Sequence, residues 1–227
     1  MILAGGLGTR LRPRFGDLPK PLTPLGGRPF LERQLEWLAG CEVVDVVLCV
    51  GHGADQVREK LGDGSALGVR LSYSTEAEPL GTGGALRLAR PFVDGPALVL
   101  NGDTLPEIDP RELERTRARH AAIGALALYQ VDDATATGVV EFDAAARITR
   151  FVEKDPAARG AAWVSGGCYA FAPALWERIP AGVSSLERDV LPALAAAGEL
   201  VAHASAGTFY DIGTPEGWER AEQRWAS

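Results

Sequence analysis

Apolar and polar positions along the chain follow two different periods. Short apolar runs such as VVDVVLCV (43–50) and PALVLNGD (96–103) predict buried strands. Between such runs, segments such as FLERQLEWLAG (30–40) carry apolar residues at helical spacing and end on a glycine. Strands therefore alternate with helices, and this order is typical of an α/β fold with a mostly parallel sheet.

The same periods predict the other elements. The first half should hold a strand at 1–4, helices at 54–62, 81–92 and 109–121, and a strand at 69–74. The second half is richer in strands, which we expect at 124–131, 138–143, 147–154, 162–171 and twice within 200–211, with helices near 173–179, 186–197 and 214–226. No internal repeat or linker interrupts this series, so residues 1–227 are predicted to form a single domain.

Composition narrows the class of protein. Hydrophobic residues are 46% and charged residues 23%, as in ordinary soluble proteins. No apolar run reaches the ~20 residues of a membrane helix, and no secretion signal is visible. The three cysteines form no CxxC pair, which disfavours a disulfide scaffold or a zinc site. We therefore expect a cytoplasmic protein that does not bind membranes.

Charge points to a small anionic ligand. The net charge of −7 argues against a nucleic-acid partner, which would need a basic surface. Positive residues nevertheless gather in the opening segment, at Arg10, Arg12, Arg14 and Lys20. The chain has only three lysines, so Lys20 invites a chemical reason, and a mobile ammonium suits a phosphate that moves during a reaction.

Residues 1–30 combine these positive charges with many glycines and prolines, which predicts a shaped loop rather than part of the core. Gly5, Gly6 and Gly8 would let the backbone approach a ligand. The spacing GxxxxGK[ST] is absent, so this is not a P-loop. Taken alone, the glycine cluster fits a plain structural turn equally well.

Several motifs occur together in a fixed order: GGLGTRLRP, PKP (19–21), PLGGRPFLERQLEWL, EPLGTGGAL (78–86), LNGD (100–103), FVEK (151–154), GGCYAF (166–171) and DIGTP (211–215). In this order the motifs resemble the signature of the sugar-1-phosphate nucleotidyltransferases. The resemblance implies a three-layer Rossmann-like α/β fold with a mixed, mostly parallel central sheet. It also implies a nucleotide-binding first half, a sugar-phosphate-binding second half, and Mg²⁺-dependent transfer of a nucleotidyl group from a nucleoside triphosphate to a sugar 1-phosphate.

The resemblance also assigns roles by motif position. Arg10 would hold the leaving phosphates, Lys20 would bridge the reacting phosphates, and Asp103 and Asp211 would hold the metal. Glu153 would bind sugar hydroxyls and Lys154 the sugar phosphate, with Gly166 and Gly167 facing the sugar. The family usually has proline after this pair, where Asp155 stands here. The expected nucleotide-binding residues are Ala4, Gly5, Gly6, Gly8, Thr9, Leu80, Gly81, Thr82 and Gly83.

Several of these residues also have a purely structural explanation. Without the resemblance, Asp103 would be a turn residue, and a bulge would explain Gly166 and Gly167 as well as a sugar does. The role of Glu78 is a separate hypothesis that the resemblance does not supply. Its carboxylate would accept hydrogen bonds from the N1 and N2 donors of guanine, but a solvated loop acid is an equal alternative.

In the details of these motifs and of further segments, including SLERDVLP (185–192) and FYDIGTPEGWERAE (209–222), the sequence is most similar to the D-glycero-α-D-manno-heptose 1-phosphate guanylyltransferases. GTP is therefore the expected donor and the heptose phosphate the expected acceptor. Mannose-1-phosphate guanylyltransferases and N-acetylmuramate-1-phosphate uridylyltransferases share much of the pattern and remain alternatives. A catalytically inactive regulatory subunit is another, although the charged motif residues are all present. A homodimer is left open.

Overall fold

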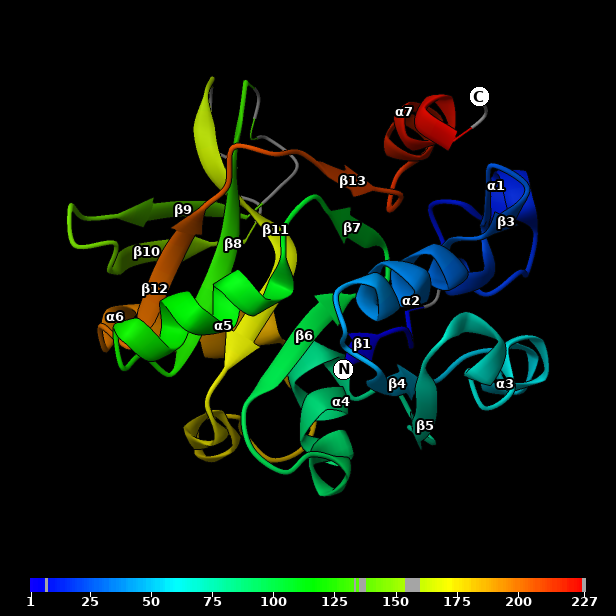
Figure 1. The fold of residues 1–227 in the computed structure, drawn as a ribbon, viewed down its shortest axis with the longest axis horizontal. Helices are drawn as coiled ribbons and strands as arrows, with labels where there is room; N and C mark the ends of the chain where they lie inside the picture. The colour runs from blue at the N-terminus through cyan, green and yellow to red at the C-terminus, as the bar shows by residue number, and fades with distance from the viewer. Residues whose placement is uncertain (7, 133, 135–137, 154–159, 226–227) are drawn as a thin grey trace. The chain divides into compact units, whose positions relative to one another are not determined.

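The computed structural model describes residues 1–6, 8–132, 134, 138–153 and 160–225, and they divide into two compact units (Figure 1). Unit 1 comprises Met1–Pro79, Leu100–Leu105 and Tyr210–Ser227, and unit 2 comprises Leu80–Val99 and Pro106–Phe209. Each unit therefore draws on segments that are far apart in the sequence. The sequence-based expectation of a single functional domain stays a prediction.

Unit 1 is built on short parallel strands: β1 (Ile2–Leu3), β4 (Asp45–Val50), β5 (Arg70–Thr75) and the last two residues of β6 (Ala97–Asn101). Their order is β6-β1-β4-β5, and Ile2 lies opposite Leu48 on one side and Leu100 on the other. Figure 1 shows β1, β4 and β5 side by side. Because all of these strands point the same way, the residues that follow them meet at one edge of the sheet.

The helical elements of unit 1 are α1 (Arg12–Phe15), η1 (Lys20–Leu22), α2 (Phe30–Gly40), α3 (Ala54–Leu61), η2 (Ser65–Leu67) and α7 (Pro215–Trp225). A small hairpin, β2 (Pro24–Leu25) with β3 (Arg28–Pro29), precedes α2. The predicted helices at 30–40, 54–62 and 214–226 are confirmed. The hairpin and the one-turn helix α1 were not predicted from the sequence.

A hydrophobic cluster in unit 1 corrects the expectation that the opening segment lies outside the core. Leu11 and Leu25 are buried in this cluster. Their partners come from α2 and from the end of the chain, where Ile212 and Trp218 lie. Apolar residues spaced between the turns of the opening segment thus anchor it. The full set of buried members is Leu11, Leu25, Phe30, Leu105, Ile212, Trp218 and Ala221.

Unit 2 contains a mixed sheet. Strand β8 (Gly124–Val131) pairs antiparallel with β11 (Ala162–Phe171) and parallel with β12 (Leu200–Ala204). Strands β9 (Val139–Phe142) and β10 (Ile148–Val152) pair antiparallel, and β9 also pairs with β11. A separate two-stranded sheet pairs β7 (Thr104–Pro106) with β13 (Phe209–Asp211), and most of its residues belong to unit 1. The strands predicted in this half are therefore confirmed.

The helical elements of unit 2 are α4 (Gly81–Ala89), η3 (Arg90–Phe92), α5 (Pro110–Arg119), η4 (Pro173–Glu177), η5 (Leu186–Val190) and α6 (Leu191–Ala196). Asp109 caps α5 as predicted, because its side chain accepts from the Arg111 backbone N–H at 2.9 Å. Figure 1 shows α5 beside β8 and β12, and α5 contacts both strands.

Two predicted helices of unit 2 are confirmed in position, but neither is a regular α-helix throughout. The segment near 186–197 is a π-helical turn followed by α6, because Pro192 has no N–H with which to continue a regular α-helical ladder. The segment near 173–179 is a 3₁₀ helix of five residues rather than an α-helix.

Candidate functional site

Two aspartates and a lysine meet at the carboxyl edge of the sheet in unit 1. Asp103 follows β6, and Asp211 ends β13. The Ile212 backbone N–H donates to the Asp103 carbonyl at 2.9 Å, which ties the two segments together. Lys20 lies in η1 and forms a hydrogen-bonded ion pair with Asp103 Oδ2. The side chains of Lys20 and Asp103 are only 13% and 25% exposed, so the pair is largely shielded from water.

Gly213 marks the point on which these three groups converge. A Cβ atom placed on Gly213 would lie 2.7 Å from Asp211 Oδ1, 3.1 Å from Asp103 Oδ2 and 3.2 Å from Lys20 Nζ. The Gly213 backbone N–H also donates to Asp211 Oδ1 at 2.5 Å. Glycine at this position therefore leaves the space between the charged atoms open.

The backbone around Lys20 is closely fitted. Gly8 has a φ of 60°, and a side chain on it would lie 3.0 Å from Lys20 Cβ. Pro19 and Pro21 flank the lysine, and a Cβ on Gly53 would collide with the Pro19 ring. The main chain of Lys20 is therefore fixed, while its long side chain keeps its own rotational freedom.

The charges perturb one another. Burial alone would raise the pKa of the Asp103 carboxyl, but the Lys20 ammonium and its hydrogen bond outweigh burial and hold that pKa below its ordinary value. Burial, with the added charge of Asp103, raises the pKa of Asp211. The positive charges of Lys20 and Arg10 act on both carboxyls. Two carboxylates directed at one space are a natural donor set for a hard divalent cation.

The opening arginines do not form one cluster. Arg10 is exposed, yet its charge acts on both aspartates. Arg14 lies 4.0 Å from the centre of the Trp218 ring and donates to Glu219 Oε1 at 3.0 Å. Arg12 pairs with Asp17 at 3.3 Å. The expected positive lining is thus reduced to Arg10 and Lys20.

The glycines after β1 border a carboxylate that sequence reasoning missed. A Cβ on Gly5 would lie 2.7 Å from Glu76 Oε1, and so would a Cβ on Gly51. Glu76 directly follows β5, and its backbone N–H donates to the Val50 carbonyl at 3.0 Å. Glu78, which the sequence analysis selected, is exposed two residues further on. Glu76 directly follows the carboxyl end of a parallel strand, where ligands of such sheets bind, and this position was the signal that favoured Glu76 over Glu78.

The other residues expected around the nucleotide in unit 1 differ in burial. Ala4 is buried, and its backbone N–H donates to the Cys49 carbonyl at 2.8 Å, so it continues the sheet. Gly6 and Thr9 are exposed, and no atom lies within 4 Å of a Cβ placed on Gly6.

In unit 2, the glycine motif at the start of α4 packs against the backbone of Ser184. The Ser184 N–H donates to the Leu80 carbonyl, and the Gly83 N–H donates to the Ser184 carbonyl, both at 2.9 Å. Side chains on Gly81 or Gly83 would collide with Ser184. This close approach explains the glycines without a ligand, and their expected contact with a nucleobase stays a prediction.

Glu187 is a further polar residue that sequence reasoning missed. Its Oε2 accepts from Thr82 Oγ1 at 2.7 Å and from Ser185 Oγ at 3.1 Å. Burial raises the pKa of the Tyr169 hydroxyl, and the charges of Glu187 and then Glu153 add to that effect. Carboxylates from η5 and from the end of β10 therefore act on one tyrosine of β11.

The residues expected around the sugar have mixed outcomes. Gly166 and Gly167 are buried in β11, where its register with β8 shifts between Ser165 and Tyr169. Gly167 has a φ of 67°, and a side chain on Gly166 would collide with the Tyr129 ring. The bulge explanation therefore holds, and a sugar contact stays a prediction. Lys154 lies outside the described residues.

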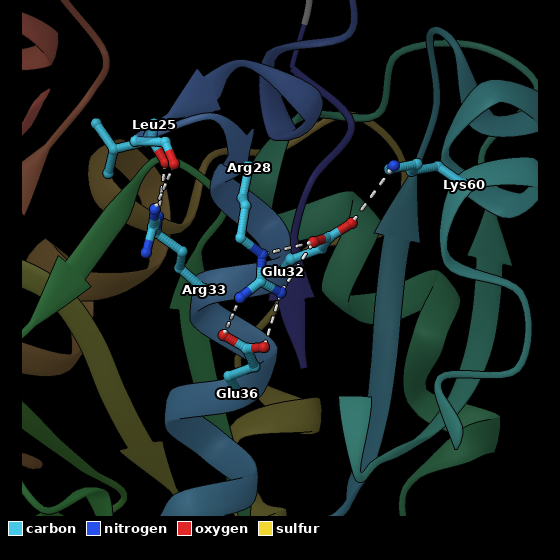
Figure 2. A network of polar contacts seen from close by, with 7 residues as sticks. Leu25, Arg28, Glu32, Arg33, Glu36 and Lys60 are labelled. Carbon is cyan, nitrogen blue, oxygen red and sulfur yellow. Dashed lines mark hydrogen bonds and ion pairs between the residues drawn. The ribbon is translucent and has the colours of Figure 1, made fainter. Parts of the chain in front are cut away.

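A network of charged residues fixes the hairpin that follows Lys20 (Figure 2). Arg28 donates to Glu32 Oε2 at 3.1 Å and to Glu36 Oε1 at 2.7 Å, both on α2. Lys60 of α3 lies 3.8 Å from Glu32 Oε1. Arg33 of α2 donates to the Leu25 carbonyl at 2.8 Å. These contacts hold β2 and β3 against α2.

Comparison with known proteins places this arrangement in one family. The sequence profile described as "Nucleotidyl transferase" matches residues 1–227. A mannose-1-phosphate guanylyltransferase of Mycobacterium tuberculosis is 38% identical over 97% of this chain and 62% of its own length. The mannose-1-phosphate guanylyltransferase catalytic subunit beta of Xenopus tropicalis is 37% identical over 95% of this chain and 61% of its own length. The chain thus spans about three fifths of these curated relatives.

Solved structures give the same result for the fold. HddC from Yersinia pseudotuberculosis, in a structure complexed with GMP-PN, superimposes with a TM-score of 0.85 at 30% identity, covering 99% of this chain and 97% of HddC. A Bacillus anthracis protein described as a putative glucose-1-phosphate thymidylyltransferase has a TM-score of 0.88 at 24% identity, with 100% and 94% covered.

The chain belongs to the nucleotidyl transferase family. The predicted fold class, a mixed and mostly parallel α/β sheet with flanking helices, is confirmed. No helix in the described ranges is long and apolar enough to cross a membrane.

Proposed function

We propose that this protein transfers a guanylyl group from GTP to a sugar 1-phosphate, releasing pyrophosphate and forming a GDP-sugar. The observation that carries the proposal is the convergence of Asp103, Asp211 and Lys20 around Gly213. The family match, the guanylyltransferases among the relatives and the GMP-PN complex of HddC support it.

The residues of unit 1 meet the needs of this reaction. The sugar-phosphate oxygen attacks the α-phosphorus in line, and negative charge moves onto pyrophosphate, so catalysis requires positive charge in fixed positions. Lys20 would follow the reacting phosphates and Arg10 would bind those that leave. Asp103 and Asp211 would hold Mg²⁺, whose charge, when it is bound, neutralises phosphate oxygens. In the described part of the chain no group of three or more His, Cys, Asp or Glu side chains gathers for a metal, which suits an ion completed by substrate oxygens.

We propose Glu76, in place of Glu78, as the carboxylate that selects guanine. Guanine offers N1–H and N2–H donors on one edge, which a single carboxylate accepts together, whereas uracil and thymine lack the second donor. Glu76 lies against Gly5 of the glycine loop, while Glu78 is exposed. Glu76→Gln should therefore lower kcat/KM for GTP at least about tenfold, and Glu78→Gln should leave it unchanged.

For the acceptor we propose a pyranose 1-phosphate with the manno configuration. The curated relatives are named for mannose 1-phosphate. The details of the sequence motifs favour the manno-heptose 1-phosphate. These two acceptors share the ring and differ at the exocyclic end. Glu153 and Lys154 are the proposed contacts to sugar hydroxyls and phosphate, and Glu187 is added because its charge reaches Tyr169 together with that of Glu153.

Pyrophosphate release from each nucleoside triphosphate, paired with mannose, manno-heptose and N-acetylglucosamine 1-phosphates, tests the proposal. We expect GTP with one manno-configured acceptor to give the highest kcat/KM, and dependence on Mg²⁺. Asp103→Asn and Asp211→Asn should each reduce turnover strongly with the fold intact. An equal kcat/KM for UTP or dTTP would overturn the choice of donor, and no pyrophosphate with any pair would favour an inactive regulatory subunit. We also propose a cytoplasmic location and leave a homodimer to measurement of the mass in solution.

A further inference from the structure

The ammonium group of Lys20 lies beside the carboxylates that are proposed to bind the metal ion. Its ammonium bonds to Asp103 Oδ2, one of the proposed metal ligands. The same point beside Gly213 that lies 2.7 Å from Asp211 Oδ1 lies 3.2 Å from Lys20 Nζ. The ammonium and both carboxylates therefore border one small space.

The charge balance at this space explains why a cation is held there. Two partly buried carboxylates this near each other repel, and a positive charge between them offsets that repulsion. Lys20 is suited to this because its backbone is fixed between Pro19 and Pro21, while its side chain turns about several bonds. The chain has two other lysines: Lys60 is paired with Glu32, and Lys154 lies outside the described residues.

We infer that Lys20 is the resident counter-ion of the metal site in the nucleotide-free protein, and that it must leave Asp103 before a divalent ion binds there. This rests on the proposed function, because the phosphates of the nucleotide give the departing ammonium a new partner. Metal without nucleotide then binds weakly, since it has to displace the lysine. Metal and nucleotide bind with positive coupling, and each tightens the other by the same factor.

Direct Mn²⁺ titration of the nucleotide-free protein, followed by the loss of the free-ion electron paramagnetic resonance signal, tests the inference. Lys20→Met keeps the length of the side chain and removes its charge. We expect this variant to bind Mn²⁺ about tenfold or more tightly than the original protein, because no charged hydrogen bond has to be broken. Lys20→Arg, which retains the charge, should show no such gain. The same holds for the matched control Lys60→Met, which removes a surface lysine from the same unit.

A Lys20→Met variant that binds Mn²⁺ no more tightly than the original protein would overturn the inference. Near-ultraviolet circular dichroism checks that the variant is folded. If it is not, Lys20→Gln, which can still hydrogen bond to Asp103, replaces it, with the same expected gain. Combining Lys20→Met with Asp103→Asn should abolish the gain, because the ligand that the lysine guards is then weakened.

This test separates the inference from the proposed function. Tight Mn²⁺ binding by Lys20→Met, together with no turnover of GTP by the original protein with any acceptor, would leave the counter-ion role standing and reject the guanylyltransferase. Normal GTP turnover by the original protein, with no gain in Mn²⁺ affinity in Lys20→Met, would support the guanylyltransferase and reject the counter-ion role.

Discussion

At the scale of single residues, Gly213 shows how an absent side chain can define a site. Its backbone N–H binds Asp211 Oδ1, and its α-carbon borders the space shared by Asp211, Asp103 and Lys20. Its φ is not positive, so the backbone itself would accept another residue. The glycine is needed for room rather than for conformation, and substitution should act on chemistry more than on folding.

Gly213→Ala should reduce turnover by about ten- to a hundredfold, because the added methyl group lies 2.7 Å from Asp211 Oδ1 and displaces it. Steady-state kinetics at saturating Mg²⁺, with a thermal melt, measure both effects. Gly40→Ala is the matched control, since no atom lies within 4 Å of its added methyl group. A Gly213→Ala enzyme with the original kcat would contradict the placement of the site.

At the scale of elements, the start of α4 depends on its contact with the Ser184 backbone. A methyl group on Gly83 would lie 2.6 Å from Ser184 Oγ and 3.2 Å from the Ser184 carbonyl oxygen. Gly83→Ala should therefore lower the free energy of unfolding by about 1–3 kcal/mol, as overpacking does. Adding Ser184→Ala removes the nearer atom and should restore part of that loss in urea titrations. If the double variant is no more stable than Gly83→Ala, the clash is not the cause.

Helix α5 and strand β12 are joined by a histidine that the folded state keeps neutral. His203 Nδ1 lies 2.8 Å from Thr116 Oγ1, and burial lowers the pKa of His203 below its ordinary value. Because the unfolded chain binds the proton more readily, stability is present above the ordinary histidine pKa and falls as the pH drops through it. Among charged neighbours, Glu112 opposes this shift and Arg119 reinforces it.

We expect the original protein to lose unfolding free energy through His203 as the pH falls from 7.5 to 5.5. His203→Asn should lack that part of the pH dependence, whatever its stability at pH 7.5. Urea titrations of both proteins at the two pH values measure the difference. Parallel pH dependence in the two proteins would reject the role of His203.

Elements with regular periods could be predicted from the sequence, and contacts between distant segments could not. The strands at 124–131 and 162–171 were predicted with the bounds that the structure shows, because both are long and predominantly apolar. The hairpin of β2 and β3 was missed, because two-residue strands have no period. Asp103 and Asp211 were chosen by family resemblance, whereas Glu76 and Ser184 required knowledge of which residues face Gly5 and Gly83.

At the scale of the whole molecule, unit 1 is completed by a segment that begins at Tyr210. Trp218 packs its ring against Phe15 with ring centres 5.3 Å apart, and its Nε1 donates to the Pro24 carbonyl at 2.8 Å. Arg14 covers the same ring. The burial of Leu11 and Leu25 therefore depends on Ile212 and Trp218, which are distant in the sequence, and this is why the sequence alone suggested a loop outside the core.

Trp218→Ala should lower the free energy of unfolding by about 3–5 kcal/mol, since it opens a cavity in this cluster. Trp218→Phe should cost less, because it keeps most of the ring and loses the hydrogen bond to Pro24. Equilibrium unfolding in urea measures both. An alanine variant within about 1 kcal/mol of the original would mean that α7 is not integral to unit 1.

The division of the chain between the two units also sets an order in time. A ribosome makes Phe209, the last residue of unit 2, before it makes any of the segment from Tyr210. Unit 1 is therefore completed after unit 2, and Leu11 and Leu25 lack Ile212 and Trp218 until the segment from Tyr210 has been made. Asp211 belongs to that same segment, so a nascent chain has no two-aspartate site to offer a metal ion until that segment has been made.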